Sequence, residues 1–375
     1  MKLLLHIGTH KTATTSIQHF LTLNRNHLVS QGYFYPKNDD SAYVFNFLAS
    51  RIAFGKCGET TTFLAGARKQ AVENNCHTLV ISGESFYAMT GFFIDIQKRG
   101  RTEDYWSSER RLIEQVKECC ASFSDIRIAC YLRPQDELAS SLYNQLIKNT
   151  FGITSDYQTF LEQTRDIYDY AAHLNLWADI FGRDKITLKN FHEAKKDIIG
   201  DFCRTFLNED CFTSAESKDF EANTRLNRDV MEVKRLYNAT SPDPALAYVS
   251  ARSFRAINDQ FPDQKSDQIF ASPEEQKRYF SAFEEGNADL ARKFGIAPLK
   301  AFSGEDKPTY PGLTAEKTAK IYLKFCEGLH SPRNRAELLA RRAVRWIMEK
   351  IPGGSKVMTP IRKLHNSLRL RTAGW

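Results

Sequence analysis

The chain has 375 residues, of which 42% are hydrophobic, 26% charged and 12% aromatic. This composition is typical of a globular protein and argues against an intrinsically disordered chain or a fibrous repeat, and the length favours one large domain with additions. The net charge is +7, but residues 331–375 alone carry eleven Lys and Arg against two Glu, so the other 330 residues have a net charge of −2 and do not form a strongly basic domain.

The first predicted element is a buried strand at Leu3–Ile7. Its apolar run is too short for a signal peptide, and no run approaches the roughly 20 residues that span a bilayer. The eight cysteines are scattered without the spacing of a zinc site or a disulfide framework, so no metal site is predicted and a reducing compartment fits best. We therefore expect a cytoplasmic protein that is at most peripheral at the inner membrane face.

A loop with phosphate-binding chemistry follows this strand and leads into a predicted helix at Thr15–Leu28. It reads His6-Ile7-Gly8-Thr9-His10-Lys11-Thr12-Ala13-Thr14-Thr15-Ser16. A strand, a tight loop and a helix N-terminus together present unpaired backbone N–H groups to an anion. Lys11 adds a mobile positive charge, and the hydroxyl groups that follow it add donors. The alternative is a threonine-rich helix cap beside a solvated lysine.

The loop differs from the phosphate loop of nucleotide triphosphatases and kinases. Lys11 comes three residues after Gly8, and no glycine immediately precedes the lysine. No predicted strand ends in an obvious aspartate that would hold magnesium. A small-molecule or nucleotide kinase with an atypical loop remains an alternative interpretation.

Three further strands are predicted, and helical stretches separate them. The strands are Thr78–Ser82, Ile126–Leu132 and Ile186–Leu188; the helices are Glu109–Ala121, Asp136–Lys148, Tyr170–Phe181 and Lys195–Leu207. This alternation predicts an α/β fold with a largely parallel central sheet flanked by helices.

Two of these strands are followed by residues that can act as a base or bind a phosphate. Glu84 follows the second strand and can serve as a general base for a hydroxyl group, or can cap the following turn. Arg133 follows the third strand and can bind a phosphate through its planar fork. Ser141, about two helical turns later, can add a hydroxyl group, with Ser140 as its neighbouring competitor. His10 fits packing or solvent contact better than catalysis.

The C-terminal half is predicted to be helical. Amphipathic helices are expected at Arg225–Tyr237 and Pro273–Lys293, and no strand is expected between them. We predict a catalytic domain at 1–301, a linker at 302–313 and a basic helical extension at 314–375. The extension suits an anionic membrane surface, although a solvated helix packed on the domain is equally compatible.

The strand followed by Gly8 and the motif Lys11-Thr12-Ala13-Thr14-Thr15-Ser16 resemble the 5′-phosphosulfate loop of sulfotransferases that use 3′-phosphoadenosine 5′-phosphosulfate (PAPS). The family usually has glycine where this chain has Ala13. The pair Arg133 and Ser141 is similar to the family's 3′-phosphate site, and glycan-specific members have a glutamate at a place comparable to Glu84. The resemblance extends over about residues 1–300.

This resemblance implies a P-loop-like nucleotide-binding fold, PAPS as the donor, and 3′-phosphoadenosine 5′-phosphate (PAP) as the product. It implies that Lys11 and Glu84 act in catalysis and that the donor is bound by the loop, Arg133, Ser141 and, as a lesser contact, Arg225. The loop residues in this set are Gly8, His10, Lys11, Thr12, Ala13, Thr14, Thr15 and Ser16. A saccharide hydroxyl, free or on a lipid, is the expected acceptor. No specific nucleic acid partner is expected, an oligomer is compatible, and a polyanion-binding or membrane-surface adaptor is the non-enzymatic alternative.

Overall fold

The computed structural model describes the chain in eight ranges, 1–37, 45–95, 104–149, 152–207, 225–240, 244–261, 269–301 and 310–350. The chain divides into two compact units that alternate along the sequence. Unit 1 comprises residues 1–142, 157–223 and 270–306, and unit 2 comprises residues 143–156, 224–269 and 307–375. The linker expected at 302–313 lies mostly outside the described residues, so the predicted domain limits stay a prediction.

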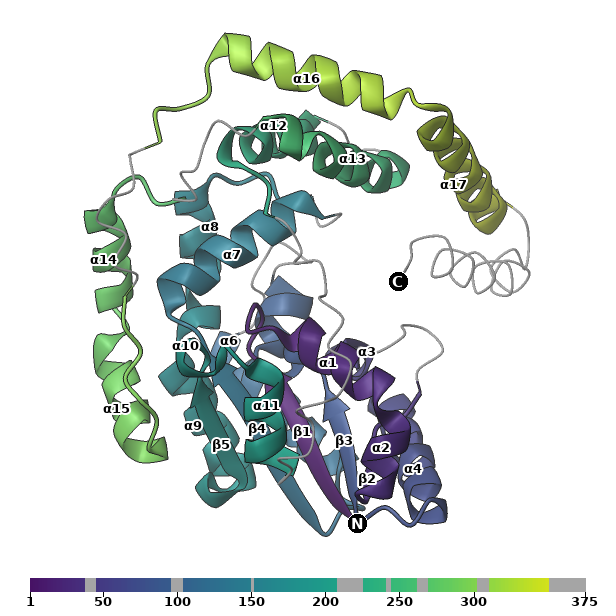
Figure 1. Ribbon diagram of the computed structural model, residues 1–375, viewed down its shortest axis with the longest axis vertical. Coiled ribbons are helices and arrows are strands. Elements are labelled where there is room, and N and C mark those ends of the chain that lie inside the picture. The colour runs from purple at the N-terminus through teal and green to yellow at the C-terminus, as the bar shows by residue number, and fades with distance from the viewer. Residues whose placement is uncertain are drawn as a thin grey trace. The chain divides into compact units, whose positions relative to one another are not determined.

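Unit 1 is built on a sheet of five parallel strands in the order β2-β3-β1-β4-β5 (Figure 1). The strands are β1 (Lys2–Gly8), β2 (Tyr33–Phe34), β3 (Thr78–Ser82), β4 (Asp125–Leu132) and β5 (Ile186–Asn190). Because all five run in the same direction, their carboxyl ends lie along one edge of the sheet. The predicted α/β class with a parallel sheet is confirmed.

The central strands are buried on both faces. In β1 only Lys2 is exposed, and every residue of β3 is buried. Parallel strands of this kind need helices on both sides of the sheet. In unit 1, α4 packs on α6, α6 packs on α9, and α1 packs against α11. The helices of this unit are α1 (Thr14–Leu23), α2 (Arg25–Ser30), α3 (Asn46–Ala53), α4 (Cys57–Glu73), α6 (Tyr105–Cys119), α7 (Gln135–Lys148, whose last six residues belong to unit 2), α8 (Tyr157–Gln163), α9 (Tyr170–Phe181), α10 (Phe191–Ala194), α11 (Ile198–Phe202), α14 (Pro273–Ser281) and α15 (Glu284–Phe294).

The regular secondary structure in the described residues of unit 2 is entirely helical. Its helices are α12 (Arg228–Thr240), α13 (Pro244–Ile257), α16 (Ala315–Leu329) and α17 (Pro332–Lys350). Phe254 of α13 stacks on Phe325 of α16, with ring centroids 4.3 Å apart, and both side chains are buried. The predicted helical character of the C-terminal extension is confirmed for α16 and α17, and its residues after 350 lie outside the described ranges. No helix in the described part of the chain is both long and apolar enough to cross a bilayer.

Three predicted helices differ from the structure. The helix expected at Thr15–Leu28 is two helices, α1 and α2, separated at Asn24. The helix expected at Pro273–Lys293 is also two, α14 and α15. The helix expected at Lys195–Leu207 is the short α11 followed by a π-helical turn at Cys203–Leu207. The breaks between α1 and α2 and between α14 and α15 fall within runs of apolar residues that keep a helical spacing, so periodicity alone did not indicate them.

Candidate functional site

Gly8 ends β1 at a point where the chain is tightly packed. Its φ is 108°, which side chains disfavour, and a Cβ atom placed there would lie 3.0 Å from both Cα and Cβ of Glu84. The Gly83 N–H donates to the carbonyl of His6 at 2.9 Å, so the end of β1 and the segment after β3 are joined by the backbone as well. The glycine therefore allows Glu84 to lie directly beside the start of the loop that contains Lys11.

The loop itself contains two left-handed residues. Lys11 has a φ of 62° and Ala13 a φ of 58°. Ala13 immediately precedes α1, and no side chain in the described residues caps this helix. Ala13 stands where the resembled family usually has glycine, and the left-handed conformation costs an alanine about 1 kcal/mol. An uncapped helix N-terminus after such a turn is well suited to an anion.

Thr9 and Thr12 fix the loop to the sheet. The Thr9 N–H and hydroxyl both donate to the carbonyl of Tyr131 in β4, at 2.9 and 3.1 Å. The Thr12 hydroxyl donates to the carbonyl of Thr9 at 2.7 Å. Both threonines are fully buried. The Thr12 hydroxyl thus stabilises the turn, and the predicted contact of Thr12 with the donor stays a prediction.

The Glu84 carboxylate belongs to a hydrogen-bonded cluster. Glu84 opens a short 3₁₀ turn after β3, and its Oε2 accepts from Nε2 of the buried Gln18 at 2.9 Å. Burial raises the pKa of Glu84, whereas the charge of His10 when that residue is protonated and hydrogen bonds from Gln18 and Asn46 lower it, and the net shift is downward. Glu84 is therefore ionised at neutral pH and able to accept a hydrogen bond from a hydroxyl group.

His10 packs against an aromatic ring. Its imidazole lies 4.0 Å from the ring of Phe92, measured between centroids. Burial lowers its pKa to about 4, the charge of Glu84 opposes this shift, and the charge of Lys11 adds to it. His10 is therefore neutral at pH 7. Its buried Nε2 has no hydrogen-bond partner among the described residues.

Arg133 lies beside the loop. It follows β4 directly, and its Nη1 donates to the carbonyl of Lys11 at 3.3 Å. Its Nε and Nη2 both donate to Oε2 of Glu137, at 2.9 and 2.8 Å. The Tyr170 hydroxyl donates to the carbonyl of Arg133 at 2.6 Å, which fixes the backbone as well. The loop after β1, Glu84 after β3 and Arg133 after β4 are thus neighbours at one edge of the sheet.

Five other predicted contacts, Ser141, Arg225, Thr14, Thr15 and Ser16, are less well connected to this group. Ser141 is buried in α7, and Ser140 beside it shares a hydrogen bond of 3.1 Å with the Tyr157 hydroxyl. Arg225 belongs to unit 2, and its predicted donor contact stays a prediction. Thr14 is buried, whereas Thr15 and Ser16 are half-buried in the first turn of α1.

No group of three or more His, Cys, Asp or Glu side chains in the described ranges is placed to hold a metal ion.

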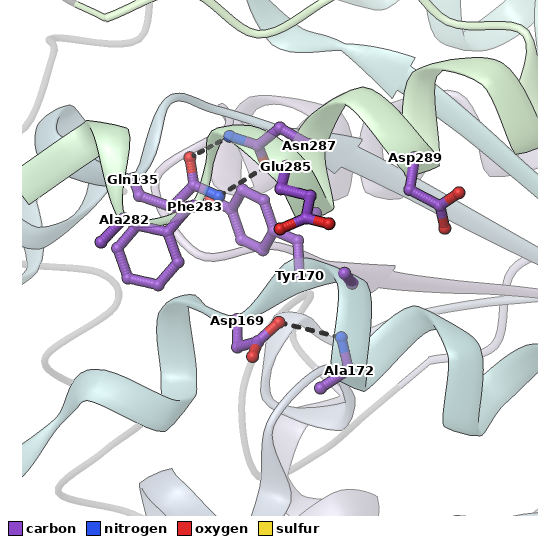
Figure 2. A pocket seen from close by; sticks show the side chains of 11 residues that line it. Gln135, Asp169, Tyr170, Ala172, Ala282, Phe283, Glu285, Asn287 and Asp289 are labelled. Atoms are coloured by element: carbon purple, nitrogen blue, oxygen red, sulfur yellow. Dashed lines mark hydrogen bonds between the residues drawn. The ribbon is translucent and has the colours of Figure 1, made fainter.

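A cavity of about 420 Å³ is lined in part by Tyr170, whose hydroxyl donates to the carbonyl of Arg133 (Figure 2). Gln135, two residues after the arginine, and Tyr170 contribute to its wall, and so do the carboxylates of Asp169, Glu285 and Asp289. Asp169 caps α9 by accepting from the Ala172 N–H at 2.9 Å, and Glu285 lies in the first turn of α15. These acids complement helix N-termini. Their charge makes the cavity unsuited to phosphate, unlike the Lys11 loop.

Two residues of this region were not singled out from the sequence. Glu137, which binds Arg133, lies four residues after it, and that spacing is a recognisable pairing signal on a helix. His192 contacts Glu137 with Nε2 to Oε1 at 3.0 Å. His192 follows β5, the neighbour of β4, but nothing in the sequence indicates that its side chain reaches Glu137.

No protein-family model matches the chain, and no curated protein matches its sequence. A solved structure, that of a sulfotransferase from Alicyclobacillus acidocaldarius, is similar with a TM-score of 0.40 and 14% sequence identity. The similarity covers 78% of this chain and 96% of that chain. A likeness this distant says nothing about the activity of this chain.

Proposed function

We propose that this protein is a sulfotransferase that moves a sulfuryl group from PAPS to an acceptor hydroxyl. The observation that carries the proposal is the convergence at one sheet edge of the Lys11 loop, Arg133 and Glu84. Arg133 donates to the carbonyl of Lys11, and Gly8 lies against Glu84. A cationic loop at a helix N-terminus, a second cation and a carboxylate are the three groups that such a transfer needs.

In this proposal each group has a separate task. Lys11 and the loop N–H groups bind the 5′-phosphate and stabilise the oxygen that leaves with PAP. Arg133 binds the 3′-phosphate. The acceptor oxygen forms a bond to sulfur while the bond between sulfur and the phosphate oxygen breaks, and Glu84 takes the acceptor proton. The acceptor is proposed to be a saccharide hydroxyl, on the basis of the resemblance at Glu84.

The proposal predicts which nucleotides stabilise the folded protein. PAP at about 100 times its dissociation constant should add about 2.7 kcal/mol of stability and raise the melting temperature by a few degrees. AMP, which lacks the 3′-phosphate, should raise it less at the same concentration. A thermal-shift comparison of PAP, AMP, ADP and ATP with and without magnesium measures this. Stabilisation by magnesium-ATP but not by PAP would contradict the proposal and favour a kinase.

Arg133→Ala should weaken PAP binding selectively. A charge-assisted contact with a phosphate contributes about 1.5 to 3 kcal/mol, so the PAP dissociation constant should rise about 10- to 100-fold. AMP binding should change little, and calorimetry with both ligands measures the difference. Because Arg133 also donates to the carbonyl of Lys11, an equal loss for PAP and AMP would mean that Arg133 supports the loop and does not read the 3′-phosphate.

A further inference from the structure

The guanidinium of Arg133 is held on one edge and open on another. Of its five N–H groups, Nε–H and one on Nη2 bind Oε2 of Glu137, and one on Nη1 binds the carbonyl of Lys11. One N–H on each terminal nitrogen is left without a partner among the described residues. Guanidinium N–H groups of this kind can donate to phosphate oxygens.

Glu137 is itself held in place. It lies in the first turn of α7, and its side chain is 12% exposed. His192 Nε2 lies 3.0 Å from Oε1 and 3.2 Å from Oε2 of Glu137. The His192 backbone is fixed in turn, because its N–H donates to Oδ1 of Asn190 at 2.9 Å. The carboxylate is therefore clamped between an arginine on one side and a histidine on the other.

The remaining neighbours restrict Arg133 further. The ring of Phe191, which precedes His192, lies 5.8 Å from the guanidinium carbon. Arg133 is 22% exposed, so part of its side chain remains accessible. A long, flexible side chain is in this way given one orientation before any ligand arrives, and such pre-organisation reduces the entropic cost of binding.

Resting on the proposed function, we propose that Glu137 and His192 are positioning residues of the 3′-phosphate site. Glu137 holds the Nε edge of Arg133, and His192 holds Glu137, so that one N–H on each terminal nitrogen of Arg133 is directed to the 3′-phosphate. Neither residue touches the donor. The pair makes the preference for a 3′-phosphorylated nucleotide depend on residues that follow two different strands, β4 and β5.

If Glu137 merely competed with the 3′-phosphate for Arg133, its removal would strengthen PAP binding. A pair of variants distinguishes that case from a positioning role. Glu137→Ala removes the hold and should raise the PAP dissociation constant about tenfold, whereas Glu137→Gln keeps an acceptor oxygen and should stay within about threefold of the wild type. AMP affinity should be unchanged in both. Calorimetry on the full chain measures all four constants, and Glu118→Gln, at an exposed position on α6, is the matched control.

A double variant tests whether Glu137 acts through Arg133. In the Arg133→Ala background, adding Glu137→Ala should cause no further loss of PAP affinity. Should Glu137→Ala not fold, His192→Ala and His192→Gln give the same comparison at a more exposed position. We expect a loss of about threefold for the alanine and near-normal PAP affinity for the glutamine.

The outcomes distinguish this inference from the proposed function. If Arg133→Ala lowers PAP affinity selectively but Glu137→Ala leaves it unchanged or improves it, Glu137 does not position Arg133 and the inference is overturned while the function stands. If the wild-type protein binds PAP no better than AMP, the proposed function fails and the inference fails with it. Losses of PAP affinity that add independently in the double variant would also overturn it.

Discussion

Lys11→Ala should abolish sulfuryl transfer, with kcat reduced by at least about 10²- to 10³-fold. In the proposed mechanism its ammonium neutralises the charge that develops on the leaving oxygen, and Lys11 is the only lysine or arginine between β1 and α1. Lys11 has a φ of 62°, and alanine carries the same Cβ, so the substitution adds no backbone strain. The measurement is the initial rate at saturating PAPS and acceptor, together with the melting temperature, which should hardly change.

Lys69→Ala is the matched control for this prediction. Lys69 lies on α4 with its side chain 79% exposed, 3.9 Å from Glu73, and exposed pairs of this kind contribute little to stability. Its removal should leave the rate unchanged. Near-normal turnover by Lys11→Ala would sink the assignment of the donor site to the loop, whereas a fall in melting temperature as large as that of a core substitution would mean that Lys11 supports the fold.

The sequence predicted the central sheet well because the strands are buried on both faces. Such strands are continuous apolar runs, and β3 has the same limits in the prediction and in the structure. The strand β2 was missed since it has only two residues, Tyr33 and Phe34, too few for any pattern. Its position depends on pairing with β3 and not on a local signal.

The break between α1 and α2 illustrates what periodicity cannot indicate. Ile17 and Leu21 are buried residues of α1, and Leu28 is a buried residue of α2. Their spacing of four and seven residues is helical, and it continues across the break. At Asn24 the side-chain Nδ2 donates to the carbonyl of Phe20 at 2.9 Å, and the same carbonyl accepts from the Asn24 N–H at 3.0 Å. A side chain that competes for a backbone carbonyl favours the end of a helix. Asparagine alone is too common in helices to predict this.

The candidate site was predictable in its parts but not in its connections. Lys11, Glu84 and Arg133 each follow a predicted strand, and parallel strands bring such residues to one edge. The bond from Arg133 to the carbonyl of Lys11 and the contact of Gly8 with Glu84 depend on strand order, which the sequence does not give. The link from His192 to Glu137 depends in the same way on β5 pairing with β4.

The structure sharpens the expected pH dependence of Glu84. A general base must be unprotonated. Burial opposes the charge of Glu84, but protonated His10 and hydrogen bonds from Gln18 and Asn46 outweigh burial and lower the pKa of this carboxyl group below its usual value. Activity that depends on Glu84 should therefore be constant from about pH 8 to about pH 5 and be lost only as the pH falls through the lowered pKa. A rate that already falls between pH 7 and pH 5 would indicate a different base.

Glu84→Gln tests that role directly, because glutamine keeps the size and can still accept from Nε2 of Gln18 but cannot take a proton at neutral pH. We expect the rate to fall by about 10²- to 10⁴-fold with PAP affinity nearly unchanged. His10→Asn is the parallel variant, since neutral His10 is the other proton acceptor beside the loop. A variant Glu84→Gln that keeps most of its activity, paired with an inactive His10→Asn, would transfer the role of base to the histidine. Loss of PAP binding in Glu84→Gln would instead mean that the charge of Glu84 is needed to organise the Lys11 loop, because glutamine keeps the Cα and Cβ atoms that lie against Gly8.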